Sequence, residues 1–254
     1  MNEGTQYYTF RCNICGAENS LPWEAFGRES GKCRSCGCWV RLRAVIHALL
    51  LGLFGQGGCL ADLPVRRDIF GLGLSDYDGY SRWLEKKFTY TNTFFHKDPK
   101  LDIVAPWRHW WEKHHFIIAS DVFEHVEPPV GRAFQGAFQL LKPGGILVLT
   151  VPFTEEEKTL EHFPELFSWR LVEGGGGRIL LNRTRDGRLQ RFENLIFHGG
   201  DGTTLEFRLF CLADLLSHLQ RAGFAEVRVL RDDVAAFGIL RQTRFSVPIL
   251  ARKT

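Results

Sequence analysis

Residues 121–153 read "DVFEHVEPPVGRAFQGAFQLLKPGGILVLTVPF" and combine an amphipathic segment with a short apolar run. Val130, Phe134 and Phe138 recur at four-residue spacing, which is the apolar stripe of a helix that faces a core. Gly144 suits the end of this helix. The "ILVLTV" that follows is almost wholly apolar, as in a parallel strand covered on both faces. The stretch therefore predicts a helix that leads into a buried strand.

Working outward, the composition of the chain sets broad limits. With 254 residues and 44% hydrophobic content, the chain can bury a sizeable core in one large and one small domain. The longest apolar run, residues 44–55, is too short to span a bilayer, so no membrane partner is expected. The first residues lack the pattern of a signal peptide, which predicts a cytoplasmic protein with reduced cysteines. A net charge of +3 is compatible with simple solubility or with a polyanionic partner, and the oligomeric state is left open.

Two cysteine pairs, "CNIC" and "CRSC", stand seventeen residues apart near the N-terminus. This spacing is typical of a structural zinc site with four thiolate ligands. The predicted ligands are Cys12, Cys15, Cys33 and Cys36, with Cys38 as a competitor for the fourth position. Reduced cysteines without metal are the alternative. We expect residues 1–58 to form a small zinc ribbon plus a connecting helix.

Residues 59–254 predict a second organisation in which strands and helices alternate. A strand from Arg67 runs into the glycine turn "GLGLSD", and a helix and the strand "TYTNTFF" follow. Later come the strand "HHFIIAS", the helix "CLADLLSHLQRAGF" and two final strands, "AEVRVL" and "FSVPILARK". The pattern predicts an α/β fold with a doubly wound sheet, which binds ligands at the carboxyl ends of its strands.

An insertion at 154–210 interrupts this alternation. It predicts a hairpin that turns at Asp186 and Gly187, followed by a glycine-rich loop and an extended segment. Because the insertion follows the carboxyl end of a strand, it is placed to act as a lid over a ligand cleft. A purely structural extension is equally compatible with the pattern.

The order "D-V-x-E-H-V", amphipathic helix, "L-K-P-G-G" and strand ending in "V-P" resembles the core of class I S-adenosylmethionine-dependent methyltransferases of the type 11 group. The resemblance covers roughly residues 67–254. It implies a Rossmann-like, seven-stranded doubly wound sheet whose last strand is antiparallel. It also implies S-adenosyl-L-methionine as cofactor, lying across the first two strands.

The resemblance also implies positions for the cofactor. Gly71 and Gly73 match the loop beside the methionine part, and Asp121 matches the segment that borders cofactor and substrate. The usual third glycine is replaced by Ser75 and Asp76, and the usual ribose-binding acid is absent. Its expected place is taken by Asn92 and Thr93, and Asp98 is the nearest carboxylate. The predicted cofactor-binding residues are thus Gly71, Gly73, Ser75, Asp76, Asn92, Thr93, Asp98 and Asp121.

Methyl transfer from a sulfonium requires alignment and exclusion of water, and it requires a base only if the acceptor must lose a proton. Candidate bases are His125, His162, His198 and Glu206. For His125, a role in starting a helix is an equal alternative. For His198 and Glu206, a solvated surface is the alternative.

These features together predict a methyltransferase with a structural zinc module, acting on a small-molecule or carbohydrate-like acceptor. Two alternatives stay open. In one, the ribbon and Arg34, Arg41 and Arg43 bind nucleic acid and direct the enzyme to RNA. In the other, the chain is a non-catalytic scaffold that has lost its cofactor.

Overall fold

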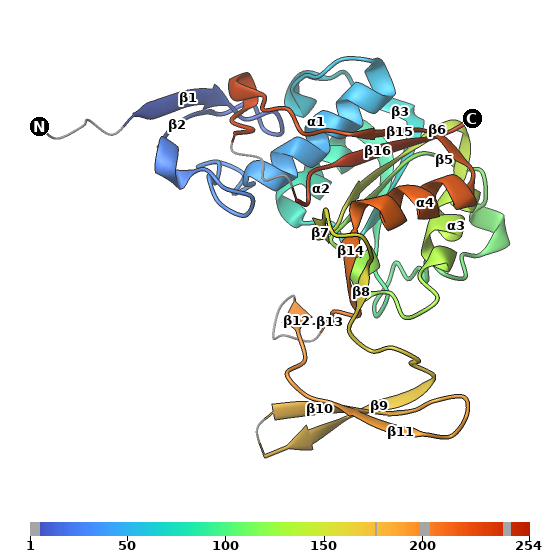
Figure 1. Ribbon diagram of the computed structural model, residues 1–254. Coiled ribbons are helices and arrows are strands. Elements are labelled where there is room, and N and C mark those ends of the chain that lie inside the picture. The colour runs from blue at the N-terminus through green and yellow to red at the C-terminus, as the bar shows by residue number, and fades with distance from the viewer. Residues whose placement is uncertain (1–5, 176, 199–203, 241–244) are drawn as a thin grey trace, which may run out of the picture.

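A six-stranded mixed sheet forms the centre of the computed structural model, which describes residues 6–175, 177–198, 204–240 and 245–254 (Figure 1). The strand order is β15-β16-β6-β5-β3-β4. Strands β3, β4, β5 and β6 are parallel to one another, whereas β16 is antiparallel to both β6 and β15. The bounds are β3 Arg66–Leu74, β4 Phe88–Thr93, β5 His114–Ser120, β6 Leu141–Thr150, β15 Phe224–Val229 and β16 Ile249–Lys253. The predicted doubly wound sheet with an antiparallel last strand is therefore present.

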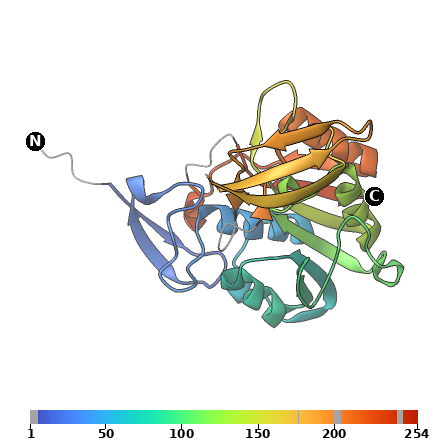
Figure 2. The same cartoon turned by 90° about the horizontal axis from the view of Figure 1, so that it is seen from below.

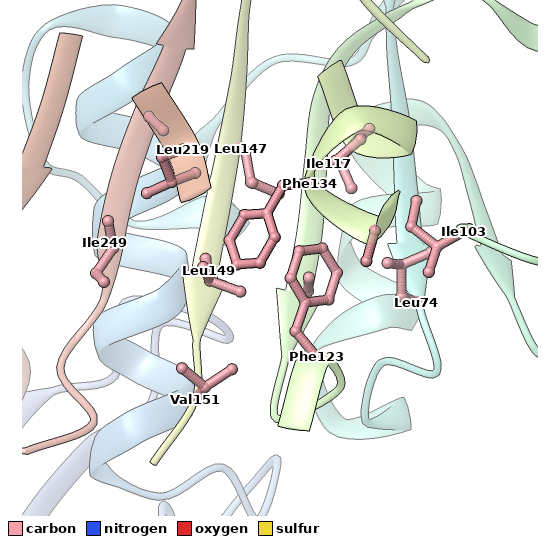
Figure 3. Packing of buried hydrophobic residues seen from close by; sticks show 14 of the residues in the cluster. Leu74, Ile103, Ile117, Phe123, Phe134, Leu147, Leu149, Val151, Leu219 and Ile249 are labelled. Carbon is pink, nitrogen blue, oxygen red and sulfur yellow. The ribbon is translucent and has the colours of Figure 1, made fainter. Parts of the chain in front are cut away.

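Helices cover both faces of this sheet because its central strands are apolar on both sides. Along β6, Leu147 and Leu149 face one core, and Ile146 and Val148 face the other. Helices α3 (Gly131–Leu140) and α4 (Leu212–Ala222) cover the first core, shown in Figure 3. Helices α1 (Val40–Phe54) and α2 (Asp78–Lys87) cover the second. Helix α3 and strand β6 confirm what the sequence around Phe134 predicts. None of the helices in the described ranges is long and apolar enough to cross a membrane.

The seventh strand expected from the resemblance is missing from the described part of the chain, where β4 is an edge strand. Between β4 and β5 the chain instead forms an isolated bridge between Phe94 and Lys100 and a short 3-10 helix, η3 (Arg108–Trp110). Two prolines in this segment lack the N–H that a sheet strand needs. Leu101 and Ile103 are buried against the α3 side of the core, which gives the segment a packing role without a strand.

The N-terminal residues form a small module around a two-stranded sheet, β1 (Tyr7–Arg11) and β2 (Glu18–Pro22), followed by a 3-10 turn, η1 (Trp23–Ala25). Helix α1 then packs on β5, β6 and β16 of the main sheet. A further 3-10 helix, η2 (Leu60–Asp62), leads into β3. The predicted connecting helix thus also forms part of the core beneath the sheet. The division of the chain at residues 58 and 59 stays a prediction.

The insertion is more elaborate than one hairpin. Strands β9 (Ser168–Gly174), β10 (Gly177–Arg183) and β11 (Leu189–Phe192) form a three-stranded sheet that projects from the body (Figures 1 and 2). The predicted turn at Asp186 and Gly187 joins β10 to β11. Short strands tie its base to the body: β7 (Phe153–Thr154), β8 (Leu160–Glu161), β12 (Phe197–His198), β13 (Thr204–Leu205) and β14 (Arg208–Cys211). The predicted glycine-rich loop at 199–203 lies outside the described residues, and the lid role stays a proposal.

The glycines of β3 make room for aromatic rings of neighbouring strands. Gly71 pairs with Phe116 of β5 and with Tyr90 of β4. A Cβ atom added to Gly71 would lie 2.0 Å from Cζ of the fully buried Phe116 ring, and one added to Gly73 would lie 1.9 Å from the Tyr90 hydroxyl. Packing inside the protein therefore explains both glycines without any ligand.

We predict that Gly71→Ala destabilises the fold by about 1–3 kcal/mol because the buried ring has no free space to enter. Adding Phe116→Leu to this variant should restore part of the loss, since the shorter side chain relieves the clash. Chemical denaturation measures both effects. Gly175→Ala is the control, because a Cβ atom there meets nothing within 4 Å. Equal losses for the two glycine variants would show that the ring is not the constraint.

Candidate functional site

Asp121 lies directly after β5, at the carboxyl edge of the sheet. Its backbone adopts a left-handed conformation with φ of 55°, which turns the chain away from the strand. The Asp121 amide donates to the carbonyl of Thr150 at 2.8 Å, and the Thr150 hydroxyl donates to the Asp121 carboxylate at 3.1 Å. The ends of β5 and β6 thus fix this carboxylate at the edge where ligands of such sheets bind.

The N-terminal module places two arginines beside Asp121. One Nη2 atom of Arg28 donates to both carboxylate oxygens at 2.8 Å. Arg41, from the first turn of α1, contacts the same carboxylate at 3.4 Å and donates to the hydroxyl of Ser120. Glu29 in turn accepts from Arg41 at 2.6 and 3.1 Å. Sequence analysis missed Arg28, because 93 positions separate it from Asp121 and no local motif marks the contact.

The candidate bases come together around Glu206. Glu206 accepts hydrogen bonds from Nε2 of His162 at 2.9 Å and from Nε2 of His198 at 2.7 Å. The ring of His198 lies 5.5 Å from the ring of His125, measured between centroids. His125 itself belongs to the 3-10 helix η4 (Phe123–His125), which follows β5. The structure therefore gathers all four predicted candidate bases in one cluster.

The return segment of the insertion, Leu205–Arg208, holds η4 in place. The amide of Phe207 donates to the carbonyl of Glu124 at 2.9 Å. Arg208 is fully buried, and its guanidinium donates to the carbonyls of Phe123 and Val126 at 3.2 and 2.5 Å. Its other partner is the carboxylate of Glu161 at 2.8 Å. Arg208 therefore positions the turn that carries His125.

The hydrogen bonds of His125 fix its tautomer. Its Nδ1 lies 2.9 Å from the carbonyl oxygen of Leu205. Because a carbonyl oxygen can only accept, Nδ1 carries the proton, and Nε2 of the neutral ring keeps its lone pair. Burial lowers the pKa of His125 below its ordinary value. The imidazole is therefore neutral at pH 7, with a free basic nitrogen.

The loop after β3 is held by internal hydrogen bonds. The side-chain amide of Asn92 accepts from the amide of Asp76 and donates to its carbonyl, both at 2.8 Å. The hydroxyl of Thr93 donates to the carbonyl of Gly73 at 2.8 Å, and the amide of Ser75 donates to the carbonyl of Thr93 at 2.7 Å. Asn92 and Thr93 were predicted to contact the ribose hydroxyls of a cofactor. In the structure they shape the loop, and their contact with a cofactor stays a prediction.

Asp76 is buried in the same loop and accepts a hydrogen bond from the Tyr90 hydroxyl at 2.5 Å. Burial raises its pKa to about 7, against the opposing effect of that hydrogen bond. Asp98, the other predicted acid, lies in an exposed segment after β4. The eight predicted cofactor residues thus fall into an internally bonded loop, an exposed acid and the edge residue Asp121. A groove of about 340 Å³ elsewhere, lined by Pro129, His218 and neighbours from α3 and α4, contains none of them.

The four predicted cysteines form a compact cluster in the N-terminal module. Their Sγ atoms all lie within 4.8 Å of one another, with 3.7 Å between Cys12 and Cys36 and 3.6 Å between Cys15 and Cys33. Four sulfurs about 2.3 Å from a tetrahedral ion would lie about 3.8 Å apart, so the cluster fits a zinc ion. Cys38 stays outside the cluster, which selects Cys36 as the fourth predicted ligand.

Two N–H groups lie close to one sulfur of the cluster. The side-chain amide of Asn19 and the backbone amide of Ser35 each lie 3.5 Å from Sγ of Cys33. Such N–H groups stabilise a thiolate and orient it toward a metal. Cys59 and Cys211 are buried separately from the cluster, as expected for structural thiols.

No family model and no curated protein matches the chain. Among solved structures, it is similar to 1,6-didemethyltoxoflavin-N1-methyltransferase from Burkholderia thailandensis, with 14% identity, a TM-score of 0.43 and coverage of 85% of this chain and 78% of that one. It is also similar to the sugar N-methyltransferase KedS8 from Streptoalloteichus, with 13% identity, a TM-score of 0.44 and coverage of 73% and 80%. For DesVI from Streptomyces venezuelae the values are 15%, 0.43, 83% and 92%.

Because these similarities are distant, the fold is assigned from the strand order of the sheet. Four parallel strands are followed by an antiparallel strand, β16, inserted between β6 and β15. With its antiparallel last strand, this fold agrees with the sequence resemblance to class I methyltransferases. It lacks the third strand of that pattern among the described residues, and it carries a four-cysteine cluster ahead of the sheet.

Proposed function

We propose that this chain is an S-adenosylmethionine-dependent methyltransferase that acts on a small-molecule or carbohydrate-like acceptor, with a structural zinc ion in its N-terminal module. The observation that carries the proposal is a neutral His125, with Nε2 free, beside Asp121 at the carboxyl edge of a class I sheet. When bound, the donor supplies an activated methyl group. The residues of the chain then have to bind, orient and desolvate the two substrates.

In this proposal His125 takes the proton from the attacking group of the acceptor at Nε2. The proton on Nδ1 stays bonded to Nδ1 and is donated to the Leu205 carbonyl, so the ring keeps its orientation while Nε2 takes up or releases a proton. Glu206, bonded to His162 and His198, fixes the wall of the site beside His125.

Limited access favours a small acceptor. The His125 side chain is only 12% exposed, and residues of the insertion, Leu205 and His198, flank it. An acceptor must therefore bring its nucleophile into a confined space. Two of the three arginines that the alternative predicts to contact RNA are poorly accessible. Arg43 is fully buried, and the Arg41 side chain, 10% exposed, is paired with Glu29.

Binding of the donor tests the proposal against the scaffold alternative. Isothermal titration of the metal-loaded chain should show binding of S-adenosylmethionine and S-adenosylhomocysteine, and none of NAD. The glycine turn lacks the third glycine that a dinucleotide requires, which is why NAD is the appropriate control. A folded chain that binds neither adenosyl ligand would overturn the proposal and support a scaffold.

The base is tested by His125→Ala. If the acceptor is a hydroxyl, single-turnover methyl transfer should slow on the order of a hundredfold, because proton removal loses its catalyst. The parent rate should fall as the pH drops through the lowered pKa of His125, below about 6.5, since protonation removes the Nε2 lone pair. This acidic limb should be absent from the variant.

His109→Ala serves as the matched histidine control, because His109 lies in η3 away from the cluster. It should leave both the rate and the pH profile unchanged. A His125 variant that keeps the full rate and the acidic limb would show that His125 only shapes η4. The base would then have to be sought in His162, His198 or Glu206.

The metal is tested by elemental analysis of protein purified without chelators, which should find one zinc per chain. Cys15→Ser should abolish this zinc and expose the module to proteolysis, because one ion would hold the two cysteine turns together through four thiolates. Cys38→Ser is the control and should retain the metal, since Cys38 lies outside the cluster. Loss of zinc in the Cys38 variant alone would reverse the ligand assignment.

A further inference from the structure

The ion pair between Arg28 and Asp121 joins the N-terminal module to the edge of the sheet at the proposed site. The two side chains are each 23% exposed, so the pair is reachable from solvent. The Nε atom of Arg28 is buried and makes no hydrogen bond within the described residues, so this guanidinium keeps unused donor capacity. Such a pair, partly exposed and incompletely bonded, is energetically weak and can be replaced by a ligand.

The surroundings hold three parts of this arrangement firmly. Asp121 is fixed by Thr150, as described above, and Arg41 is fixed by Glu29 and Ser120. The backbone of Arg28 is also fixed, because its carbonyl accepts from the amide of Arg41 at 3.0 Å in the first turn of α1. Within the described residues, the side chain of Arg28 bonds only to Asp121 and the neighbouring Glu29. It is therefore the part that can move to admit a ligand.

The charges select the class of ligand. A simple anion at this place would meet the negative charge of Asp121, and a simple cation would meet the positive charges of Arg28 and Arg41. A zwitterion satisfies both signs at once, because its negative group replaces Asp121 on the arginines and its positive group replaces Arg28 on Asp121. An α-amino acid carries these two charges on adjacent atoms of one small group.

We propose that Arg28, Arg41 and Asp121 form a receptor for the α-amino acid group of the methyl donor, with the carboxylate bound by the arginines and the ammonium bound by Asp121. This inference rests on the proposed function and adds residues of the metal module to the donor site. Binding of this group would exchange the ion pair between Arg28 and Asp121 for two new pairs with the ligand. The module thus completes the site, and it does more than stabilise the fold.

Two ligands that differ only in the amino acid part test the receptor. S-adenosylhomocysteine carries this group, whereas 5′-methylthioadenosine lacks it. In titrations of the zinc-loaded full chain, the parent should bind S-adenosylhomocysteine at least about tenfold more tightly. Arg28→Ala should weaken S-adenosylhomocysteine roughly 10- to 100-fold and leave 5′-methylthioadenosine unchanged. Asp121→Asn, which keeps the shape of the side chain, should show the same selective loss.

Arg66→Ala is the matched control, because it also removes an arginine that pairs with an aspartate, at 2.6 Å to Asp68, but at the opposite end of β3. It should leave both affinities at the parent value. Equal weakening of both ligands by Arg28→Ala would show a purely structural arginine and overturn the receptor. Equal affinity of the parent for both ligands would also overturn the receptor. That result is expected if these residues instead bind an acceptor that carries an amino acid group. Failure of the parent to bind either nucleoside would instead overturn the proposed function itself.

Discussion

The buried guanidinium of Arg43 is the interaction on which the arrangement of the site depends. It donates to the carbonyls of Gly31 and Cys38 in the module at 2.8 Å and to the carbonyl of Gly238 near the C-terminus at 2.7 Å. Burial of a charged group is costly unless its donors are satisfied. Three carbonyls meet most of that need, and the nearby cysteines add favourable negative charge when they bind zinc as thiolates. Arg43 therefore links the metal cluster, helix α1 and the C-terminal segment in one place.

A second buried arginine has the same role on the other side of the site. Arg208 ties the return segment of the insertion to the carbonyls of η4, just as Arg43 ties the module to α1. Segments far apart in the sequence thus approach Asp121 from two directions, and each is anchored by a cation without solvent contact. This explains how a site assembled largely from loops can hold fixed positions, since its supports are buried hydrogen bonds to the backbone.

The sequence was informative where chemistry is local. The stripe around Phe134, the run in β6 and the spacing of the two cysteine pairs each reflect a short-range geometric requirement, and the structure contains all three. The seventh strand that the resemblance implies is absent from the described residues, where the segment between β4 and β5 contains two prolines and packs its apolar residues on the core. Gly71 and Gly73 were interpreted as space for a ligand, which stays a prediction, and the structure adds that a Cβ atom at these positions would clash with Phe116 or Tyr90 from adjacent strands.

Contacts across long separations explain the rest of what was missed. Arg28 is an ordinary loop residue in the sequence, and only the docking of the module brings it to Asp121. The clustering of His162, His198 and Glu206 depends likewise on the path of the insertion. A candidate list drawn from residue types found the members of this cluster. It could not show that these residues lie close together in the fold, because neither segment alone determines how two distant segments align.

The carboxyl groups around Asp121 differ in how strongly their surroundings favour the charged form. Glu124 is buried next to Asp121 and Glu206, and both burial and these carboxylates raise its pKa well above the ordinary value. Because its surroundings favour the neutral carboxyl group, Glu124 opposes the positive charge of Arg28 and Arg41 less than Asp121 and Glu29 do. Nε2 of His125 lies 3.9 Å from Oε1 of Glu124, beyond hydrogen-bond distance, and burial lowers the pKa of this imidazole. Burial thus favours the neutral forms of both neighbours, and an uncharged imidazole keeps the lone pair that can take a proton.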